Sequence, residues 1–458
     1  MNAPVHFIPP HPEPRTVPPS VLEIITTVLR NPLELWGVPS YTEDHIKTRF
    51  LNERTLIVND PALIKYVLVD NAKNYRMGTI RQLILRPILR DGLLTAEGQT
   101  WRRSRKAMAP VFTPRHISGF SRTMLSVTEA FCERYQGNGE VREISHDMTE
   151  LTYEILAETL FSGDSVGDGG NFADDVEKLL DTMGRVDPLD LLKAPSFVPR
   201  IFRLRGKSVL AKFRKMVGDL ARERRELMKS DPASVPEDFL TLLLKTEGPD
   251  GLTAREIEDN IITFIGAGHE TTARALGWTL FCLANAPGER AIVEEEIDAF
   301  YARGELPSPE NWLDELPKTR AVFEEAMRLY PPAPSINRAA IEDDQFGDVV
   351  IEKDLTILIM PWTLHRHRKL WDEPDAFIPS RFWPENRESM HRFQYLPFGA
   401  GPRICIGATF ALQEAVIALA VLLSRYRLDM AEGAADPWPV QKLTTQPVGG
   451  IHMTVTRR

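Results

Sequence analysis

Along most of this chain the apolar residues recur three and four positions apart, the spacing that gathers them on one face of an α-helix. This period predicts helices over residues 61–71, 97–109, 115–136, 143–161, 205–229, 253–285, 287–303 and 313–330. A few stretches indicate β-strands, namely 55–60, 349–361 and 451–457, the last with strict alternation. The pattern therefore predicts a mainly α fold with a small antiparallel β component.

Two segments depart from this period. Residues 371–400 are rich in proline and aromatic residues, and a loop of this length usually has a functional or covering role. The proline-rich residues 1–18 are expected to form a mobile leader. Because no internal repeat or low-complexity linker interrupts the rest, we expect residues 19–458 to form a single domain.

The predicted helix at 253–285 is unusual in its middle. It begins with a capping box, Thr253 and Glu256, and about 32 residues at about 1.5 Å each give roughly 48 Å. Residues 263–276, "TFIGAGHETTARAL", place glycines and polar side chains in an otherwise apolar helix. Each glycine costs about 1 kcal/mol relative to alanine, and buried polar groups require partners. These residues predict a cavity, a kink or a bound ligand.

Charge and cysteine content exclude several classes of protein. The formal net charge is −9, which argues against nucleic acid as a partner. Cys132, Cys282 and Cys405 are far apart, which excludes zinc-ribbon, iron–sulfur and thioredoxin-like sites. The apolar stretch 21–30 is too short to span a bilayer. We expect a cytoplasmic protein without a membrane anchor.

Cys405 lies in "FGAGPRICIGATFALQEA" (398–415), just before a predicted helix. A helix N-terminus and backbone N–H groups stabilise a thiolate. Gly399, Gly401 and Gly407 allow tight turns and a close approach to a flat group, and Arg403 can pair with a carboxylate. These features fit a haem iron held by cysteine, and the alternative is a structural or nucleophilic cysteine.

The stretch "FGAGPRICIG" (398–407) resembles the haem-binding signature of the cytochrome P-450 superfamily, the haem-thiolate monooxygenases, in their soluble bacterial form. Three further motifs follow the family's order, so the resemblance covers nearly the whole chain. It implies haem b (iron protoporphyrin IX), with Cys405 as the axial iron ligand and Phe398 as a cofactor-binding residue.

The segment "AGHETT" (267–272) resembles the family's oxygen-activating segment. The resemblance implies that Thr271 hydrogen-bonds the oxygen being activated and that Glu270 helps to bring protons in. On physical grounds, an acid beside a hydroxyl on an apolar helix forms a plausible proton relay. The alternative is a polar turn on a surface helix, and His269 is expected to be a packed or solvated residue.

Glu325 and Arg328 resemble the family's glutamate–arginine pair, with Arg381 as the third member. The family's usual glutamate before that arginine is Ser380 here. The resemblance implies a buried salt-bridge network that fixes the cysteine loop. Taken without the family, a glutamate and an arginine three residues apart are ordinary surface pairing.

Four residues resemble the family's partners for the haem propionates, and they are Trp101, Arg105, Arg338 and Arg403. Trp101 and Arg105 lie four residues apart, on one helix face. Core packing is the alternative for Trp101 and a solvated surface for Arg338. His365 and His367 raise a histidine-ligated haem as a rival, but neither has the turn that surrounds Cys405.

The resemblance implies insertion of one oxygen atom from O2 into an apolar organic substrate. By position, the residues expected to line the substrate pocket are Leu94, Ala267, Ala333, Ile336 and Val448. The alternatives are a peroxide-using haem-thiolate enzyme and a non-catalytic haem-thiolate ligand binder. The Glu270–Thr271 pair favours monooxygenation.

We expect two electrons to come from another protein, since no flavin or ferredoxin module follows the cysteine in this sequence. We expect an acidic ferredoxin or flavodoxin with its reductase. A basic cluster on an acidic chain can steer an acidic partner, and this chain has such a cluster within 102–106, namely Arg102, Arg103, Arg105 and Lys106. The alternative for this cluster is a solvated helix face.

Overall fold

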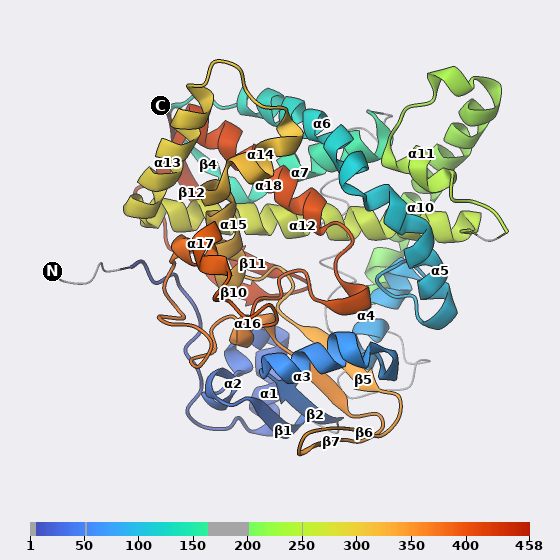
Figure 1. Ribbon diagram of the computed structural model, residues 1–458, viewed down its shortest axis with the longest axis vertical. Coiled ribbons are helices and arrows are strands. Elements are labelled where there is room, and N and C mark those ends of the chain that lie inside the picture. Colours follow the sequence, from blue (N-terminus) through green and yellow to red (C-terminus); the bar gives the residue numbers. More distant parts are fainter. Residues whose placement is uncertain (1–5, 51–52, 164–200, 250) are drawn as a thin grey trace. The chain divides into compact units, whose positions relative to one another are not determined.

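The computed structural model describes residues 6–50, 53–163, 201–249 and 251–458 (Figure 1). The chain divides into two compact units. Unit 1 comprises residues 1–78, 124–151 and 271–458, and unit 2 comprises residues 79–123 and 152–270. Helices predominate in both units, so the predicted mainly α fold is confirmed. The hypothesis of one domain over 19–458 stays a prediction.

Three long helices pass from one unit into the other along the chain: α6 (Pro114–Cys132), α7 (Ile144–Phe161) and α12 (Ala254–Asn285). Unit 2 also contains α4 (Thr79–Leu89), α5 (Gly98–Met108), α10 (Ile201–Ser230) and α11 (Phe239–Leu244). Unit 1 also contains α1 (Val21–Arg30), α2 (Pro39–Thr42), α3 (Pro61–Lys65), α13 (Pro287–Tyr301), α14 (Trp312–Glu315), α15 (Pro317–Leu329), α16 (Pro361–Leu364), α17 (Pro384–Arg387) and α18 (Ala408–Arg425).

Some predicted elements are divided in the structure. The helix predicted over 313–330 is two helices, α14 and α15, because Pro317 has no N–H to continue α14 and instead begins α15. The strand predicted over 349–361 is two strands, β7 (Val349–Ile351) and β8 (Thr356–Ile359). The turn between them contains Asp354 at φ +61°. Both divisions arise at turns, one before a proline and one at a residue with positive φ, and the spacing of apolar residues does not reveal such turns.

The β component belongs to unit 1. Its largest sheet has the order β1 (His45–Phe50), β2 (Glu53–Val58), β8, β5 (Ile336–Ala340) and β3 (Tyr75–Met77). The β2–β8 pair is parallel and the other pairs of this sheet are antiparallel. A three-stranded antiparallel sheet has the order β4 (Asn138–Glu143), β12 (His452–Arg457) and β9 (Tyr426–Met430). Two hairpins complete the component, β6 (Asp344–Phe346) with β7, and β10 (Trp438–Gln441) with β11 (Thr445–Val448).

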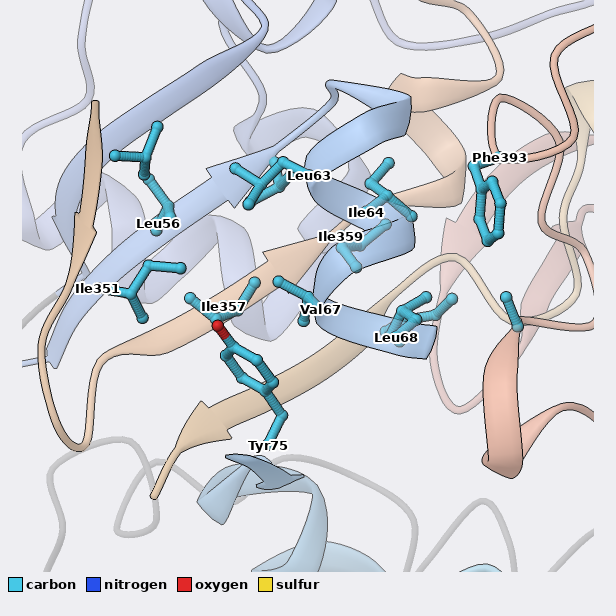
Figure 2. Close-up of a cluster of buried hydrophobic side chains, with 14 of the residues drawn as sticks. Leu56, Leu63, Ile64, Val67, Leu68, Tyr75, Ile351, Ile357, Ile359 and Phe393 are labelled. Carbon is cyan, nitrogen blue, oxygen red and sulfur yellow. The ribbon is translucent and has the colours of Figure 1, made fainter. Parts of the chain in front are cut away.

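The five-stranded sheet is covered by α3 and by η2 (Tyr66–Asp70), a single π-helical stretch that follows it (Figure 2). Leu63 of α3 and Val67 of η2 are buried together with Ile357 and Ile359 of β8. The same apolar cluster includes Phe393, Leu396 and Ala400. The segment 371–400, for which the sequence predicts a covering or functional role, therefore contributes side chains to the core next to the sheet.

Two of the longer helices, α12 and α18, have residues in unit 1. The capping box predicted for α12 is present, since Thr253 Oγ1 accepts the N–H of Glu256 at 3.2 Å and the Glu256 carboxylate accepts the N–H of Thr253 at 2.9 Å. Among the described residues, α18 is the one helix long and apolar enough to cross a membrane, and 67% of it is buried inside the protein. Such burial is what a core helix shows.

Residues 1–5 of the predicted leader lie outside the described residues, and residues 6–18 contact later parts of unit 1. The carbonyl of Phe7 accepts the N–H of Phe377 at 2.8 Å, and the carbonyl of Pro10 accepts the hydroxyl of Tyr330 at 2.7 Å. Arg15 donates its N–H to the carbonyl of Trp36 at 3.0 Å. These bonds hold the described part of the leader against the rest of unit 1.

Candidate functional site

Cys405 lies between the turn η8 (Gly401–Arg403) and the first turn of α18, whose N-cap is Gly407. Its side chain is exposed, although Leu396 and Ala400 of the preceding loop are buried. The N–H of Cys405 donates to the carbonyl of Phe398 at 2.9 Å, which fixes the thiol's direction from the backbone. The positive end of the α18 helix dipole favours a negative charge nearby, so this location suits a thiolate.

The glycine spacing around Cys405 has a direct steric reason. Gly399 and Gly401 have φ values of +69° and +73°, which L side chains rarely adopt. A Cβ on Gly401 would lie 1.8 Å from the carbonyl oxygen of Leu68 in η2. The cysteine loop therefore lies directly on η2, and this approach is open only to glycine.

The predicted ion-pair residues meet behind this loop. Arg328 donates from Nε to Glu325 Oε2 at 2.7 Å and from Nη2 to Oε1 at 2.8 Å, and both side chains are fully buried. Arg381 Nε lies 3.5 Å from Glu325 Oε1. Arg328 also donates to the carbonyls of Pro374 and Ala376, so the network ties α15 to the segment that leads to the cysteine loop.

The remaining predicted cofactor residues lie in both units. In unit 1, Arg338 on β5 is 9% exposed, and Phe398 and Arg403 on the cysteine loop are half-buried. In unit 2, Trp101 and Arg105 are half-buried on α5. Within unit 1, an exposed thiol beside a helix N-terminus, with the buried Arg338 and the half-buried Arg403, fits an iron porphyrin that carries two carboxylates.

The middle of α12 contains an accessible stretch between two buried stretches, 259–265 and 272–283. Ala267 is exposed and Thr271 is half-buried, whereas Glu270 is 5% exposed. Gly268 serves packing, because a Cβ there would lie 3.2 Å from Leu156 of α7. His269 is buried, with Nδ1 2.8 Å from the carbonyl of Ile265, so it is the packed residue that the sequence predicts.

Sequence reasoning missed a buried acid in α18. Glu414 is 2% exposed, and burial raises the pKa of its carboxyl to about 8, although a hydrogen bond with Thr272 acts in the opposite direction. Thr272 follows Thr271 on α12, so this bond joins the two helices within unit 1. The available signal is a lone glutamate within the apolar run "ALQEAVIALAVLL" (411–423).

Among the predicted pocket residues, Leu94 is half-buried in unit 2. The N–H of Leu93 donates to Asn260 Oδ1 of α12 at 2.7 Å, and Gly92 allows this approach, since a Cβ there would lie 2.1 Å from the hydroxyl of Thr263. The segment with Leu94 is therefore anchored on α12.

In unit 1, Ala333 is half-buried and Ile336 is 8% exposed. Thr445 at the turn end of the β10–β11 hairpin donates its N–H to the carbonyl of Pro332 at 3.2 Å, next to Ala333. Val448 pairs with Trp438 at the other end of this hairpin, and its side chain is 48% exposed. The part of the hairpin that approaches Ala333 is thus the turn at 442–444, which sequence reasoning missed.

His365 and His367, which the sequence offers as alternative haem ligands, both form hydrogen bonds with backbone groups. His365 is buried, with Nε2 bound by the N–H of Leu396 at 2.8 Å. His367 is also buried, with Nε2 3.2 Å from the carbonyl of Glu43. Neither imidazole presents a nitrogen at an accessible surface, so the geometry favours Cys405 over both.

Comparisons with known proteins show which family this chain belongs to. The family model described as cytochrome P-450 matches residues 30–453. A cytokinin hydroxylase of Arabidopsis thaliana is 32% identical, over 87% of this chain and 78% of its own. The cyclooctatin synthase of Streptomyces melanosporofaciens is 30% identical, over 92% of this chain and 90% of its own.

A solved structure shows the same architecture. The crystal structure of a cytochrome P-450, CYP102L1, has a TM-score of 0.81 and 25% identity, and the match covers 98% of this chain and all of that one. The haem domain of another cytochrome P-450 has a TM-score of 0.79. The chain therefore belongs to the cytochrome P-450 family, whose members hold haem through a cysteine thiolate, and it is a monooxygenase of that family.

Proposed function

We propose that this enzyme inserts one atom of O2 into an apolar organic substrate at a haem b held by Cys405, with electrons from a separate protein. The observation that carries this proposal is the exposed thiol of Cys405 at the start of α18, on a loop that also contains the buried side chains of Leu396 and Ala400. When bound, the haem supplies the oxygen chemistry, and a thiolate ligand favours O–O cleavage.

The protein's own groups have separate tasks in this proposal. Arg338, Arg403, Trp101 and Arg105 hold the haem carboxylates, and Phe398 packs against the ring. The ion-pair network of Glu325, Arg328 and Arg381 keeps the cysteine loop in place and has no part in the chemistry. A guanidinium group suits a carboxylate because it can donate two parallel hydrogen bonds to the two oxygens and carries the opposite charge.

Thr271 and Glu270 manage protons in this proposal. Thr271 is half-buried beside the exposed Ala267 one helical turn earlier, so its hydroxyl borders accessible space on α12. The Thr271 hydroxyl would donate a hydrogen bond to the outer oxygen atom of the O–O bond that is to be cleaved. Glu270, which is 5% exposed, would pass protons to it. Such positioned acid–base groups typically contribute about 10²–10⁴-fold to a rate.

The substrate pocket in this proposal is lined by Leu94, Ala267, Ala333 and Ile336, all of them apolar. Leu443, in the hairpin turn next to Thr444, is a better candidate than Val448 because this turn approaches Pro332. The related cytokinin hydroxylase is named for a hydroxylation, and hydroxylation is the reaction that we propose here. We also propose a cytoplasmic location without a membrane anchor, which fractionation of cells would test.

The deciding experiment replaces Cys405 by serine and records the spectrum of the reduced, carbon monoxide-bound protein. We expect the strongly red-shifted thiolate band to disappear in Cys405→Ser. The control is Cys132→Ser, because burial raises the pKa of the Cys132 thiol to about 12 and no thiolate forms there at neutral pH. Survival of the band in Cys405→Ser would refute the assignment.

Labelled oxygen separates monooxygenation from its two alternatives. With a reducing system and ¹⁸O2, a monooxygenase incorporates one labelled atom into product. A peroxide-using enzyme forms product from added peroxide without a reducing system and takes no label from ¹⁸O2. A ligand binder shifts the haem band on binding and forms no product under either condition.

A further inference from the structure

His365 lies between the ion-pair network and the cysteine loop, and both of its ring nitrogens have partners. Nδ1 lies 3.2 Å from the carbonyl oxygen of Arg328, and Nε2 lies 2.8 Å from the backbone nitrogen of Leu396. A carbonyl can only accept and a backbone N–H can only donate. The ring therefore carries its proton on Nδ1 and accepts at Nε2.

Arg328 and His365 hold each other through two hydrogen bonds. The guanidinium of Arg328 donates from Nη1 to the carbonyl of His365 at 2.7 Å, and the imidazole of His365 donates back to the carbonyl of Arg328. Both side chains are fully buried. Because Arg328 is also paired with Glu325 in a bidentate arrangement, His365 is attached to a rigid charged group.

On the other side of the ring, Leu396 begins the loop that ends at Cys405. Leu396 lies outside the helices and strands, so no sheet or helix ladder satisfies its N–H. Its carbonyl accepts the N–H of Gly399 at 3.1 Å, and the carbonyl of Phe398 accepts the N–H of Cys405 at 2.9 Å. Two hydrogen-bonded turns thus connect the partner of His365 with the thiol.

We propose that His365 is a positioning residue that transmits the rigidity of the ion-pair network to the cysteine loop through its hydrogen bond with the Leu396 amide. Its consequence for the haem depends on the proposed role of Cys405, but the positioning itself does not. Burial and then the charge of Arg328 lower the pKa of His365 to about 3, so the ring remains a neutral acceptor at physiological pH. The alternative is that His365 only packs against the ring of Tyr395, 5.2 Å away between centroids.

Two conservative variants separate the two hydrogen bonds. In His365→Gln the amide oxygen reaches the place of Nε2, so the bond with Leu396 can be retained. In His365→Asn the shorter amide reaches the place of Nδ1 and the carbonyl of Arg328, but not Leu396. The measurement is hydrogen exchange of the holoenzyme by mass spectrometry, read for peptides that cover 393–405 and for peptides that cover α15.

We expect exchange in 393–405 to become roughly three- to tenfold faster in His365→Asn, as loss of one hydrogen bond implies, while α15 keeps its protection. The reduced, carbon monoxide-bound Asn variant should also lose part of its red-shifted thiolate band. His365→Gln should match the parent in both readouts. Equal exchange in the Asn variant and the parent, or equal loss of protection in α15 and 393–405, would overturn the proposal.

The parent protein supplies a test that needs no variant to fold. The amide of Leu396 should be protected from exchange as strongly as the amides of β8, despite its place in a loop. If Leu396 exchanges as fast as exposed loop amides, the hydrogen bond is absent and the proposal is wrong. These exchange results stand apart from the Cys405→Ser experiment, since they do not depend on turnover or on which residue binds iron.

Discussion

At the scale of single residues, Thr271 and Thr272 are neighbours with different surroundings. Thr272 is 3% exposed and bonded to Glu414, whereas Thr271 is half-buried on the accessible part of α12. We predict that Thr271→Ala keeps its haem and still consumes reducing equivalents, but yields at least about tenfold less product per electron and releases hydrogen peroxide instead. The measurement is simultaneous recording of product, peroxide and electron consumption.

Thr279→Ala is the control for this prediction. The hydroxyl of Thr279 lies two turns further along α12 and donates to the carbonyl of Ala275 at 2.7 Å, so its hydrogen bond is made within α12. Its removal should leave the yield of product per electron unchanged. If Thr271→Ala couples electrons to product as well as Thr279→Ala does, the proposed proton role of Thr271 is wrong.

Gly401 allows a second prediction at this scale. Gly401→Ala combines an unfavourable φ of +73° with a Cβ placed 1.8 Å from the Leu68 carbonyl, so the loop must move away from η2. Gly433 has φ +74° and nothing within 4 Å of its Cβ position, so Gly433→Ala isolates the backbone strain. That strain costs about 1–2 kcal/mol.

We predict that Gly401→Ala lowers the free energy of unfolding by clearly more than Gly433→Ala and lowers the haem content, as urea denaturation and the haem spectrum would record. Equal effects of the two variants would mean that the contact with Leu68 is unimportant.

The residue scale also shows what a sequence can reveal. Cys405 and the glycines around it are recognisable because their types and spacing are constrained by one short turn. His365 is not recognisable in this way, because its partner Leu396 is 31 residues away and its bond is to a backbone amide that any residue would supply. Long-range bonds to the backbone leave no mark on residue identity, so only the structure reveals them.

At the scale of elements, α12 and α18 are joined by the buried pair of Thr272 and Glu414. The folded-state pKa of Glu414 is about 8, above its ordinary value of 4.5. Between these two values the folded protein keeps a proton that the unfolded chain releases. The free energy of unfolding therefore falls as pH rises from about 4.5 to about 8, by about 1.4 kcal/mol per unit at most.

Glu414→Gln should remove this dependence, because a glutamine can retain the bond with Thr272 and does not titrate. We predict that the variant and the parent are similarly stable near pH 4.5 and that the variant is several kcal/mol more stable near pH 8. Urea denaturation at intervals of one pH unit measures this difference. Glu432→Gln, at an exposed position, is the control. Parallel pH profiles for Glu414→Gln and the parent would contradict the prediction.

Most long helices could be predicted at this scale, because their apolar faces pack over many turns and average out local exceptions. The division of 313–330 at Pro317 and of 349–361 at Asp354 could not be predicted from apolar spacing, which continues across both turns. The role of Val448 in a pocket stays a prediction. The bond of Thr445 with the carbonyl of Pro332, which brings the hairpin turn near Ala333, could not be predicted because it joins backbone groups that are far apart in the sequence.

At the scale of the whole molecule, a net charge of −9 is combined with a basic stretch on α5. Arg102, Arg103 and Lys106 are exposed, but Arg103 also pairs with the Glu256 carboxylate of the capping box that begins α12. Reversal of charge at Arg103 would therefore disturb α12 as well as any docking surface. Arg102 and Lys106 are the better positions for a test of electron transfer.

We predict that Arg102→Glu and Lys106→Glu each slow reduction by an acidic ferredoxin or flavodoxin several-fold at low salt, because a local basic surface raises the association rate with an acidic partner. The Debye length falls from about 8 Å at physiological salt to about 3 Å at 1 M, so the difference from the parent should shrink as salt rises. Stopped-flow reduction at several salt concentrations measures both effects. Lys47→Glu reverses an exposed charge on β1 in unit 1 and changes the net charge equally, so it separates local steering from total charge. If Lys47→Glu slows reduction as much as Arg102→Glu, total charge governs the encounter and α5 is not the docking surface.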